Sequence, residues 1–121
     1  MSAPIVFMDI AGENSEELKL FYSELFDWQI GDDGQFNTAV LSPSESQPML
    51  MGAVRQDPSE KVFYIGVKDV AKKLSAIEAR GGIIDQPRFE VPGVVVLGLF
   101  KDPAGNRMGL VELENGKIRI P

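Results

Sequence analysis

Apolar and polar positions along the chain alternate in a pattern that predicts two successive runs of one strand, one helix and three short strands. In the first run, residues 4–10 predict a strand. Residues 12–28 predict a helix that begins at Asn14 or Ser15, because both residue types cap helices and acidic residues fill the first turn. Its expected buried stripe consists of Leu18, Phe21, Tyr22, Leu25 and Phe26. Short extended segments follow near 28–31, 35–42 and 48–55.

The second run repeats this order. Residues 61–67 predict a strand, and residues 68–82 predict a helix that stops at Gly81 and Gly82. Further strands are expected at 83–90, 94–101 and 106–113, with a tight hairpin at the Asp-Pro-Ala-Gly-Asn turn. Two β-α-β-β-β units in one short chain indicate an internal repeat, whose two sheets are expected to lie side by side around a shared concavity.

Composition narrows the class of protein. A chain of 121 residues fits one domain, with modules expected at about 3–56 and 60–115, and 44% hydrophobic with 25% charged residues is ordinary globular usage. The apolar run near the N-terminus is interrupted by Asp9, so no secretory signal is expected and a cytoplasmic location is the default. No apolar stretch is long enough for a membrane span.

Charge and residue types exclude several kinds of chemistry. The net charge is −6 and the basic residues are scattered, which makes nucleic acid a poor candidate partner. The chain has no cysteine, so it has no disulfide, thiolate nucleophile or cysteine zinc site. It also has no histidine, which removes the commonest general base and the commonest transition-metal ligand.

Three segments in order carry a family resemblance: "FYSELFDWQI", "GVKDVAKKLSAIEARGGII" and "FKDPAGNRMGLVEL". Together they resemble the vicinal oxygen chelate superfamily, which includes glyoxalase I, extradiol dioxygenases, and bleomycin or fosfomycin resistance proteins. The resemblance covers nearly the whole chain. It implies an α+β fold of two βαβββ modules that form a curved mixed sheet around a cavity. It also implies a homodimer, although a monomer whose own two modules close the cavity stays open.

Metal-binding members of this superfamily place His and Glu ligands on the first, fourth, fifth and eighth strands. The matching positions here are 5–7, 49–54, Val62 and Gly109, and none offers an acid or imidazole. The resemblance therefore implies the metal scaffold without its metal site, and no cofactor is expected. Glu112 alternates onto the other side of the last strand, where we expect an ordinary solvated or capping acid.

The cavity then becomes the candidate site, since an apolar pocket with a few polar groups is the usual form of a small-molecule site. Alternation places four side chains on its inner surface and two at its rims: Asp9, Met51, Tyr64 and Arg107 inside, Trp28 and Phe100 at the rims. Asp9 is suited to a cationic ligand, Arg107 to a carboxylate, and Tyr64 to stacking or hydrogen bonding. The competing interpretation is that Asp9 and Arg107 pair with one another and that Tyr64 and Trp28 only pack.

Two functions remain. The first is a metal-independent protein that binds a small organic molecule, with sequestration or sensing similar to the bleomycin-resistance branch. The second is a lyase or isomerase related to glyoxalases and dioxygenases, which uses Asp9 or Tyr64 as acid or base, or a metal site that the alignment misses. The five methionines could line a pliable pocket, but Met is also an ordinary gap filler, so Met8, Met49 and Met108 are expected in the core, while both places stay open for Met51.

Overall fold

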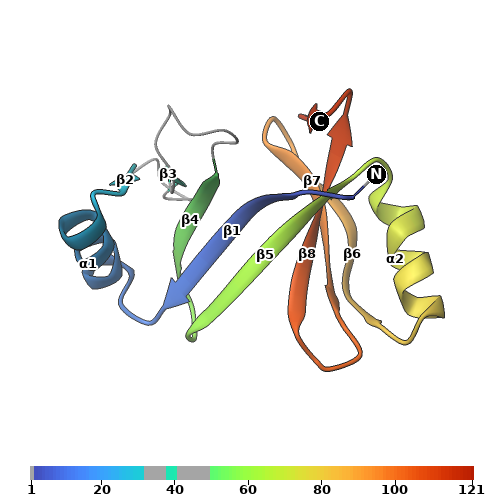
Figure 1. Cartoon of the computed structure of the whole chain (residues 1–121), viewed down its shortest axis with the longest axis horizontal. Helices are drawn as coiled ribbons and strands as arrows, with labels where there is room; N and C mark the ends of the chain where they lie inside the picture. The colour runs from blue at the N-terminus through green and yellow to red at the C-terminus, as the bar shows by residue number, and fades with distance from the viewer. Residues whose placement is uncertain (1, 32–37, 41–49) are drawn as a thin grey trace. The chain divides into compact units, whose positions relative to one another are not determined.

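The computed structural model describes residues 2–31, 38–40 and 50–121. The chain divides into two compact units, one of Phe7–Val62 and one of Phe63–Pro121 with Met1–Val6. The elements repeat as predicted: one strand, one helix and three strands, twice over, so the α+β fold of two βαβββ modules is confirmed (Figure 1). The predicted segments at 35–37, 41–42 and 48–49, and Met49 itself, lie outside the described residues.

The first module contains five elements. These are β1 (Ile5–Gly12), α1 (Ser15–Phe26), β2 (Gln29–Ile30), β3 (Thr38–Val40) and β4 (Met51–Gln56). Its strands are ordered β2-β3-β4-β1, with β1 and β4 parallel and the other pairs antiparallel. The helix starts where predicted, because the Asn14 side chain accepts a hydrogen bond from the Glu17 N–H at 3.1 Å.

The expected buried stripe of α1 is wrong in part. Leu18 and Tyr22 are half-buried, but Phe21, Leu25 and Phe26 are 48%, 64% and 58% exposed. Two contacts fix a different rotation of the helix. The Ser15 hydroxyl donates to Gln56 Oε1 on β4 at 3.2 Å, and the Tyr22 ring stacks on Trp28. The side of α1 that carries Ser15 and Tyr22 is therefore the covered one.

The second module has the same topology. Its elements are β5 (Glu60–Val67), α2 (Val70–Ala79), β6 (Ile83–Val91), β7 (Val95–Lys101), β8 (Arg107–Glu114) and β9 (Lys117–Ile118). The strands are ordered β5-β8-β7-β6, with β5 and β8 parallel. Strand β9, which we did not predict, returns along β8 after Asn115 and Gly116, both with positive φ.

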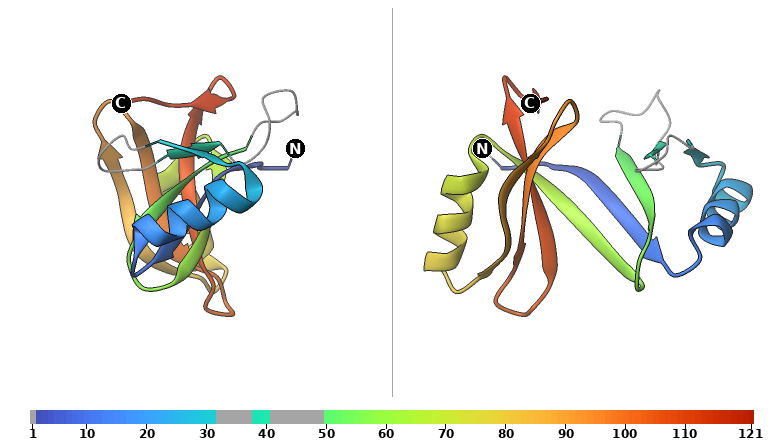
Figure 2. Two further views of the ribbon diagram at one scale, coloured as in Figure 1. Left: turned by 90° about the vertical axis from the view of Figure 1, so that its left-hand side faces the viewer. Right: turned by 180° about the vertical axis from the view of Figure 1, so that it is seen from behind.

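The core of the second module lies between its sheet and α2, which Figure 2 shows beside β6 and β7. Its buried members are Val67, Val70, Leu74, Phe100 and Leu110. The helix lies close to β7 because Gly98 has no side chain there: an added Cβ would be 3.0 Å from Leu74 and from Val70. Met108 packs against this core, as expected.

The predicted hairpin between β7 and β8 is confirmed. The Asp102 carboxylate accepts hydrogen bonds from the N–H groups of Ala104 and Asn106, and Gly105 has a φ of 91°. The Asn106 side chain also donates to Asp102, and these bonds hold the pKa of Asp102 below its usual value. The turn chemistry of the sequence therefore fixes this end of the sheet.

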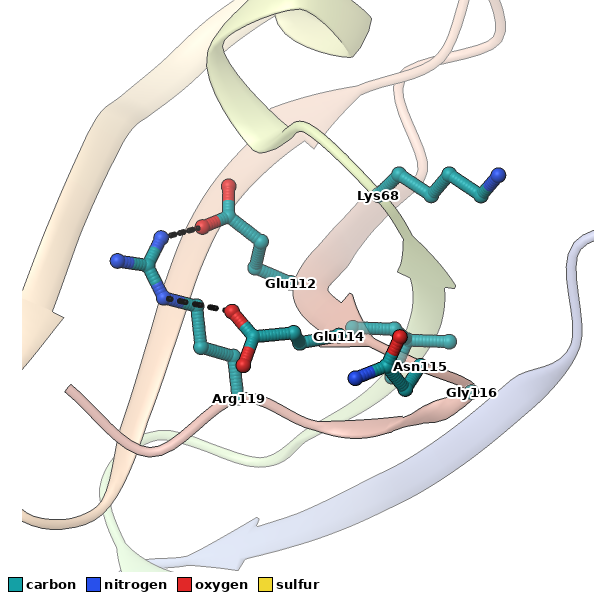
Figure 3. Close-up of a pocket in the computed structure, with 7 residues that line it drawn as sticks. Lys68, Glu112, Glu114, Asn115, Gly116 and Arg119 are labelled. Atoms are coloured by element: carbon teal, nitrogen blue, oxygen red, sulfur yellow. Dashed lines mark hydrogen bonds and ion pairs between the residues drawn. The ribbon is translucent and has the colours of Figure 1, made fainter.

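Glu112 on β8 joins four parts of the second module. Its carboxylate is buried and accepts hydrogen bonds from the Val70 N–H at 3.0 Å and from Arg119 Nη1 at 2.6 Å (Figure 3). Arg88 on β6 donates to it at 3.3 Å. The expectation of a capping acid is confirmed, but this acid is not solvated. Glu112 holds the start of α2 against β8 through the Val70 N–H. It also connects β8 to β6 through Arg88 and to the segment after β9 through Arg119.

Glu112 also makes the stability of the fold depend on pH. Burial acts to raise the pKa of Glu112, but the Val70 N–H and the guanidinium groups of Arg88 and Arg119 lower it by more, so it lies below its ordinary value of 4.5. A carboxyl with a depressed folded pKa contributes stability above its unfolded pKa. That contribution is lost as the pH falls through the folded pKa.

We therefore expect Glu112→Gln to lower the free energy of unfolding at pH 7 by about 1–3 kcal/mol. The reason is that a neutral amide then takes the place of a carboxylate that accepts hydrogen bonds from three donors. The difference from wild type should shrink as the pH falls from 4.5 through the lower folded pKa of Glu112, because wild-type Glu112 then becomes protonated as well. Urea unfolding of both proteins from pH 3 to pH 7 measures this. A difference that does not change with pH would contradict the assignment.

Candidate functional site

Each sheet has one face covered by its helix and one turned away from it, which we name the free face. In the second module, β5, β8 and β7 are in register at Tyr64, Gly109 and Leu99. Their neighbours in sequence, Leu110 and Phe100, belong to the core under α2. Because strand residues alternate between faces, Tyr64, Gly109, Leu99 and Arg107 lie on the free face. The place predicted for Tyr64 and Arg107, on the inner surface of a shared cavity, stays a prediction.

The Tyr64 ring lies over Gly109. A Cβ added at residue 109 would be 2.9 Å from Cγ of Tyr64 and would overlap Cδ2 and Cε2. Only glycine leaves the ring this place on the strand. Gly109 is also the position where the family resemblance places an acidic metal ligand, so an aromatic ring covers that part of the strand here.

Arg107, at the start of β8, forms an ion pair with Asp85 of β6. Its Nε donates to Asp85 Oδ2 of β6 at 2.9 Å, and each side chain is about one third exposed, at 32% and 33%. Asp85 was missed in the sequence because nothing in its spacing distinguishes it from the other surface acids. The positive charge expected to hold a ligand carboxylate therefore already has a protein carboxylate beside it.

The free face of the first module carries a second charge cluster. In the register of β1 with β4, Phe7 lies opposite Met51 and Asp9 opposite Ala53, whereas Gln56 lies on the side that contacts α1. Asp9 is 5% exposed, and Arg55 Nε lies 3.1 Å from its Oδ1. Arg55 also reaches Asp57 at 2.8 Å and Glu60 at 2.6 Å.

These acids keep the Arg55 guanidinium charged. Burial acts to lower the pKa of Arg55, but Glu60, Asp9 and Asp57 together raise it above its ordinary value. The competing interpretation paired Asp9 with Arg107, whereas its own module supplies Arg55 as a partner. The sequence alone did not indicate Arg55, because the pairing depends on the register that puts Arg55 two residues beyond Ala53, on the same face of the neighbouring strand.

The remaining predicted residues are placed as follows. Met51 is half-buried on the free face of the first module. Trp28 stacks on Tyr22 with ring centroids 4.6 Å apart and planes 10° apart, so it packs against the end of α1. Phe100 is 7% exposed within the core under α2. Its predicted place at a cavity rim is wrong, because even-numbered residues of β7 face the helix.

A hollow of about 490 Å³ lies at the end of β8 in the second module (Figure 3). Lys68, Arg119 and residues 112–116 line it. Two of the lining acids form ion pairs with Arg119: Glu112 at 2.6 Å and Glu114 at 4.0 Å. The charged groups of the hollow therefore already pair with one another. No motif or spacing in the sequence indicates this hollow.

Among residues 2–31, 38–40 and 50–121, no group of three acidic side chains is arranged to hold a metal ion. Within the same residues, neither helix has the length and apolar character that crossing a bilayer requires.

No family model matches the sequence. No curated protein matches it either. Solved structures do match over nearly the full length. A methylmalonyl-CoA epimerase in complex with methylmalonyl-CoA and NH4+ has a TM-score of 0.67 and 12% identity, over 98% of this chain and 100% of that chain.

Two further structures agree. A Streptomyces coelicolor methylmalonyl-CoA epimerase variant with 2-nitronate-propionyl-CoA has a TM-score of 0.66 and 12% identity, over 100% of both chains. A hypothetical protein from Bacillus halodurans has a TM-score of 0.66 and 12% identity, over 95% of this chain and 97% of that chain. The chain has the vicinal oxygen chelate fold. At this identity the likeness shows the fold alone, since one fold hosts many chemistries.

The contact of Tyr64 with Gly109 gives a direct prediction. Gly109→Ala should lower the free energy of unfolding by about 1–3 kcal/mol, because the new methyl group overlaps the tyrosine ring. In a Tyr64→Ala background, the same glycine substitution should cost much less. A double-mutant cycle by chemical denaturation measures this coupling. Equal costs in both backgrounds would show that the ring is not what residue 109 accommodates.

Proposed function

We propose that this protein binds a small organic molecule on the free faces of its sheets without a metal ion, and that it sequesters or senses that molecule. The observation that carries the proposal is the Tyr64 ring over Gly109. At the position where the resemblance places an acidic metal ligand, the strand supports an aromatic surface instead. Such a surface is suited to stacking against a planar ligand.

The other free-face residues suggest the chemistry of the ligand. Met51 adds a pliable apolar surface in the first module. Arg107 and Asp9 are charged but have counter-charges, Asp85 and Arg55, that hold their orientation. Charges fixed in this way are suited to orienting a bound molecule rather than to exchanging protons with it. We infer a partly aromatic ligand that also carries a cationic or carboxylate group.

Thermal unfolding in the presence of EDTA tests this proposal. A panel of aromatic cations, aromatic carboxylates and bleomycin is added in turn to the purified protein. A ligand present at 100 times its Kd should stabilise the folded state by about 2.7 kcal/mol, which is several degrees in Tm. Ni²⁺, Zn²⁺, Mn²⁺, Fe²⁺ and Mg²⁺ are then added without EDTA. A rise with one metal that EDTA reverses would contradict metal-independent binding.

A pair of matched variants locates the site. Met51→Trp fills part of the free face of the first module and should weaken binding of any stabilising compound at least tenfold by calorimetry. Ile83→Trp adds a similar bulk at a residue of β6 that is 62% exposed, and should leave binding unchanged. Equal affinity in wild type and Met51→Trp would place the ligand elsewhere.

An isomerase is the second candidate, and the solved epimerases with this fold are the observation that favours it. In that case Asp9 or Tyr64 would move a proton at the substrate. Methylmalonyl-CoA in D₂O offers a direct assay, because epimerisation exchanges its α-proton for deuterium and NMR detects the loss. We expect no exchange by the wild-type protein. Exchange that Asp9→Asn abolishes would establish the isomerase instead.

A further inference from the structure

The turn between β8 and β9 carries the only Asn-Gly pair of the sequence, Asn115 with Gly116. Both residues are exposed, and both have positive φ, 54° at Asn115 and 76° at Gly116. The hydrogen bonds that close a turn of this length belong to the residues on either side, here Glu114 and Lys117. The Asn115 amide and the Gly116 nitrogen therefore lie together at an exposed tip.

This pair contains the atoms for an intramolecular reaction at the asparagine. The Gly116 nitrogen attacks Cγ of Asn115, a C–N bond forms, and the amide nitrogen leaves as ammonia with the proton of the attacking nitrogen. Water then opens the cyclic imide at one of its two carbonyl carbons, which leaves aspartate or isoaspartate at position 115. The reaction consumes water, releases ammonia and needs no oxidant. Gly116 assists it because it has no side chain to obstruct the approach.

The hairpin that presents this turn is short. Strand β9 has two residues and pairs with β8 alone among the described strands. Beyond it, the Arg119 N–H donates to the backbone oxygen of Glu112 and the Gly93 N–H to that of Pro121, each at 2.9 Å. Short exposed segments held by few hydrogen bonds open locally at a much lower free energy than the whole fold. Such opening gives the attacking nitrogen the freedom to reach the side chain.

A carboxylate formed at position 115 would meet a cation that already serves another acid. Asn115 and Arg119 line the same hollow, and so does Lys68 (Figure 3). Arg119 Nη1 lies 2.6 Å from the carboxylate of Glu112. A second carboxylate in the hollow competes for this guanidinium, since carboxylates are its preferred partners. Isoaspartate also adds a methylene to the backbone, which shifts β9 along β8.

We propose that Asn115 is a modification site, where deamidation creates a carboxylate that draws Arg119 away from Glu112 and loosens the segment after β9. The start of α2 keeps its bond from the Val70 N–H to Glu112, so the module stays folded. The reaction needs no partner and no ligand, so it proceeds with the age of the protein and is independent of the binding proposed above.

Incubation of the purified full chain at 37 °C, at pH 6 and at pH 8.5, tests the reaction. Peptide mass spectrometry should show Asn115 gaining about one mass unit at least tenfold faster than Asn14, Asn37 and Asn106, the other asparagines. Conversion should be faster at pH 8.5, because the backbone nitrogen attacks after losing its proton. Both aspartate and isoaspartate should appear, since the imide opens in two ways. Equal rates at all four asparagines, or an unchanged Asn115, would overturn the proposal.

A charge variant tests the effect on Arg119. Asn115→Asp reproduces the new carboxylate without the backbone change, and amide hydrogen exchange should then be at least fivefold faster at the Arg119 N–H. Asn14→Asp is the matched control, because it adds the same charge in the first module and aspartate also caps helices. It should leave Arg119 exchange unchanged. Circular dichroism confirms that both variants are folded. Wild-type exchange at Arg119 in Asn115→Asp would show that the carboxylate does not compete with Glu112.

Discussion

The buried carboxylate of Glu112 is the interaction on which the second module depends. It accepts the Val70 N–H at the start of α2 and two guanidinium groups, one from β6 and one from beyond β9. A buried charge is tolerated when several donors surround it, and removing the donors would leave a large desolvation cost. Because these donors come from separate parts of the chain, one side chain fixes the helix on a particular face of the sheet. The opposite face is the free face, on which Leu99 and Val111 are 9% and 3% exposed.

The free face of each module depends on its own local contacts. Gly109 allows the Tyr64 ring to lie on β8, so the surface there is flat and aromatic. In the first module, Arg55 holds Asp9 in place from the neighbouring strand. Each module thus combines an aromatic ring with an ion pair: Tyr64 with Arg107 and Asp85 in the second, and Phe7 with Asp9 and Arg55 in the first.

Sequence patterns predicted the elements well because turn chemistry is local. Asn14, Asp102 and Gly105 act within a few residues of themselves, so their caps and turns could be recognised directly. Alternation along strands assigns Tyr64, Arg107 and Met51 to the faces turned away from the helices, where the strand register puts them, but their place in a shared cavity stays a prediction. It failed for Phe100, which was assigned to a rim although its even position on β7 faces α2.

Partners across strands were harder to predict. Arg55 and Asp85 are unremarkable in the sequence, and only the register of the strands brings them to Asp9 and Arg107. The rotation of α1 could not be predicted either, because the hydrogen bond of Ser15 with Gln56 overrides the preference of Phe21 and Leu25 for burial. Long-range polar contacts therefore set the details that hydrophobic periodicity leaves open.

The stack of Trp28 on Tyr22 has a spectroscopic consequence. Trp28 is the only tryptophan of the chain and belongs to the unit formed by Phe7–Val62. Its emission therefore reports the loss of structure in that unit alone, whereas circular dichroism sums both units. Two-state unfolding requires the two signals to change together. An intrinsic-fluorescence curve of this protein is a curve for its first module, and its agreement with circular dichroism measures how far the two halves unfold as one.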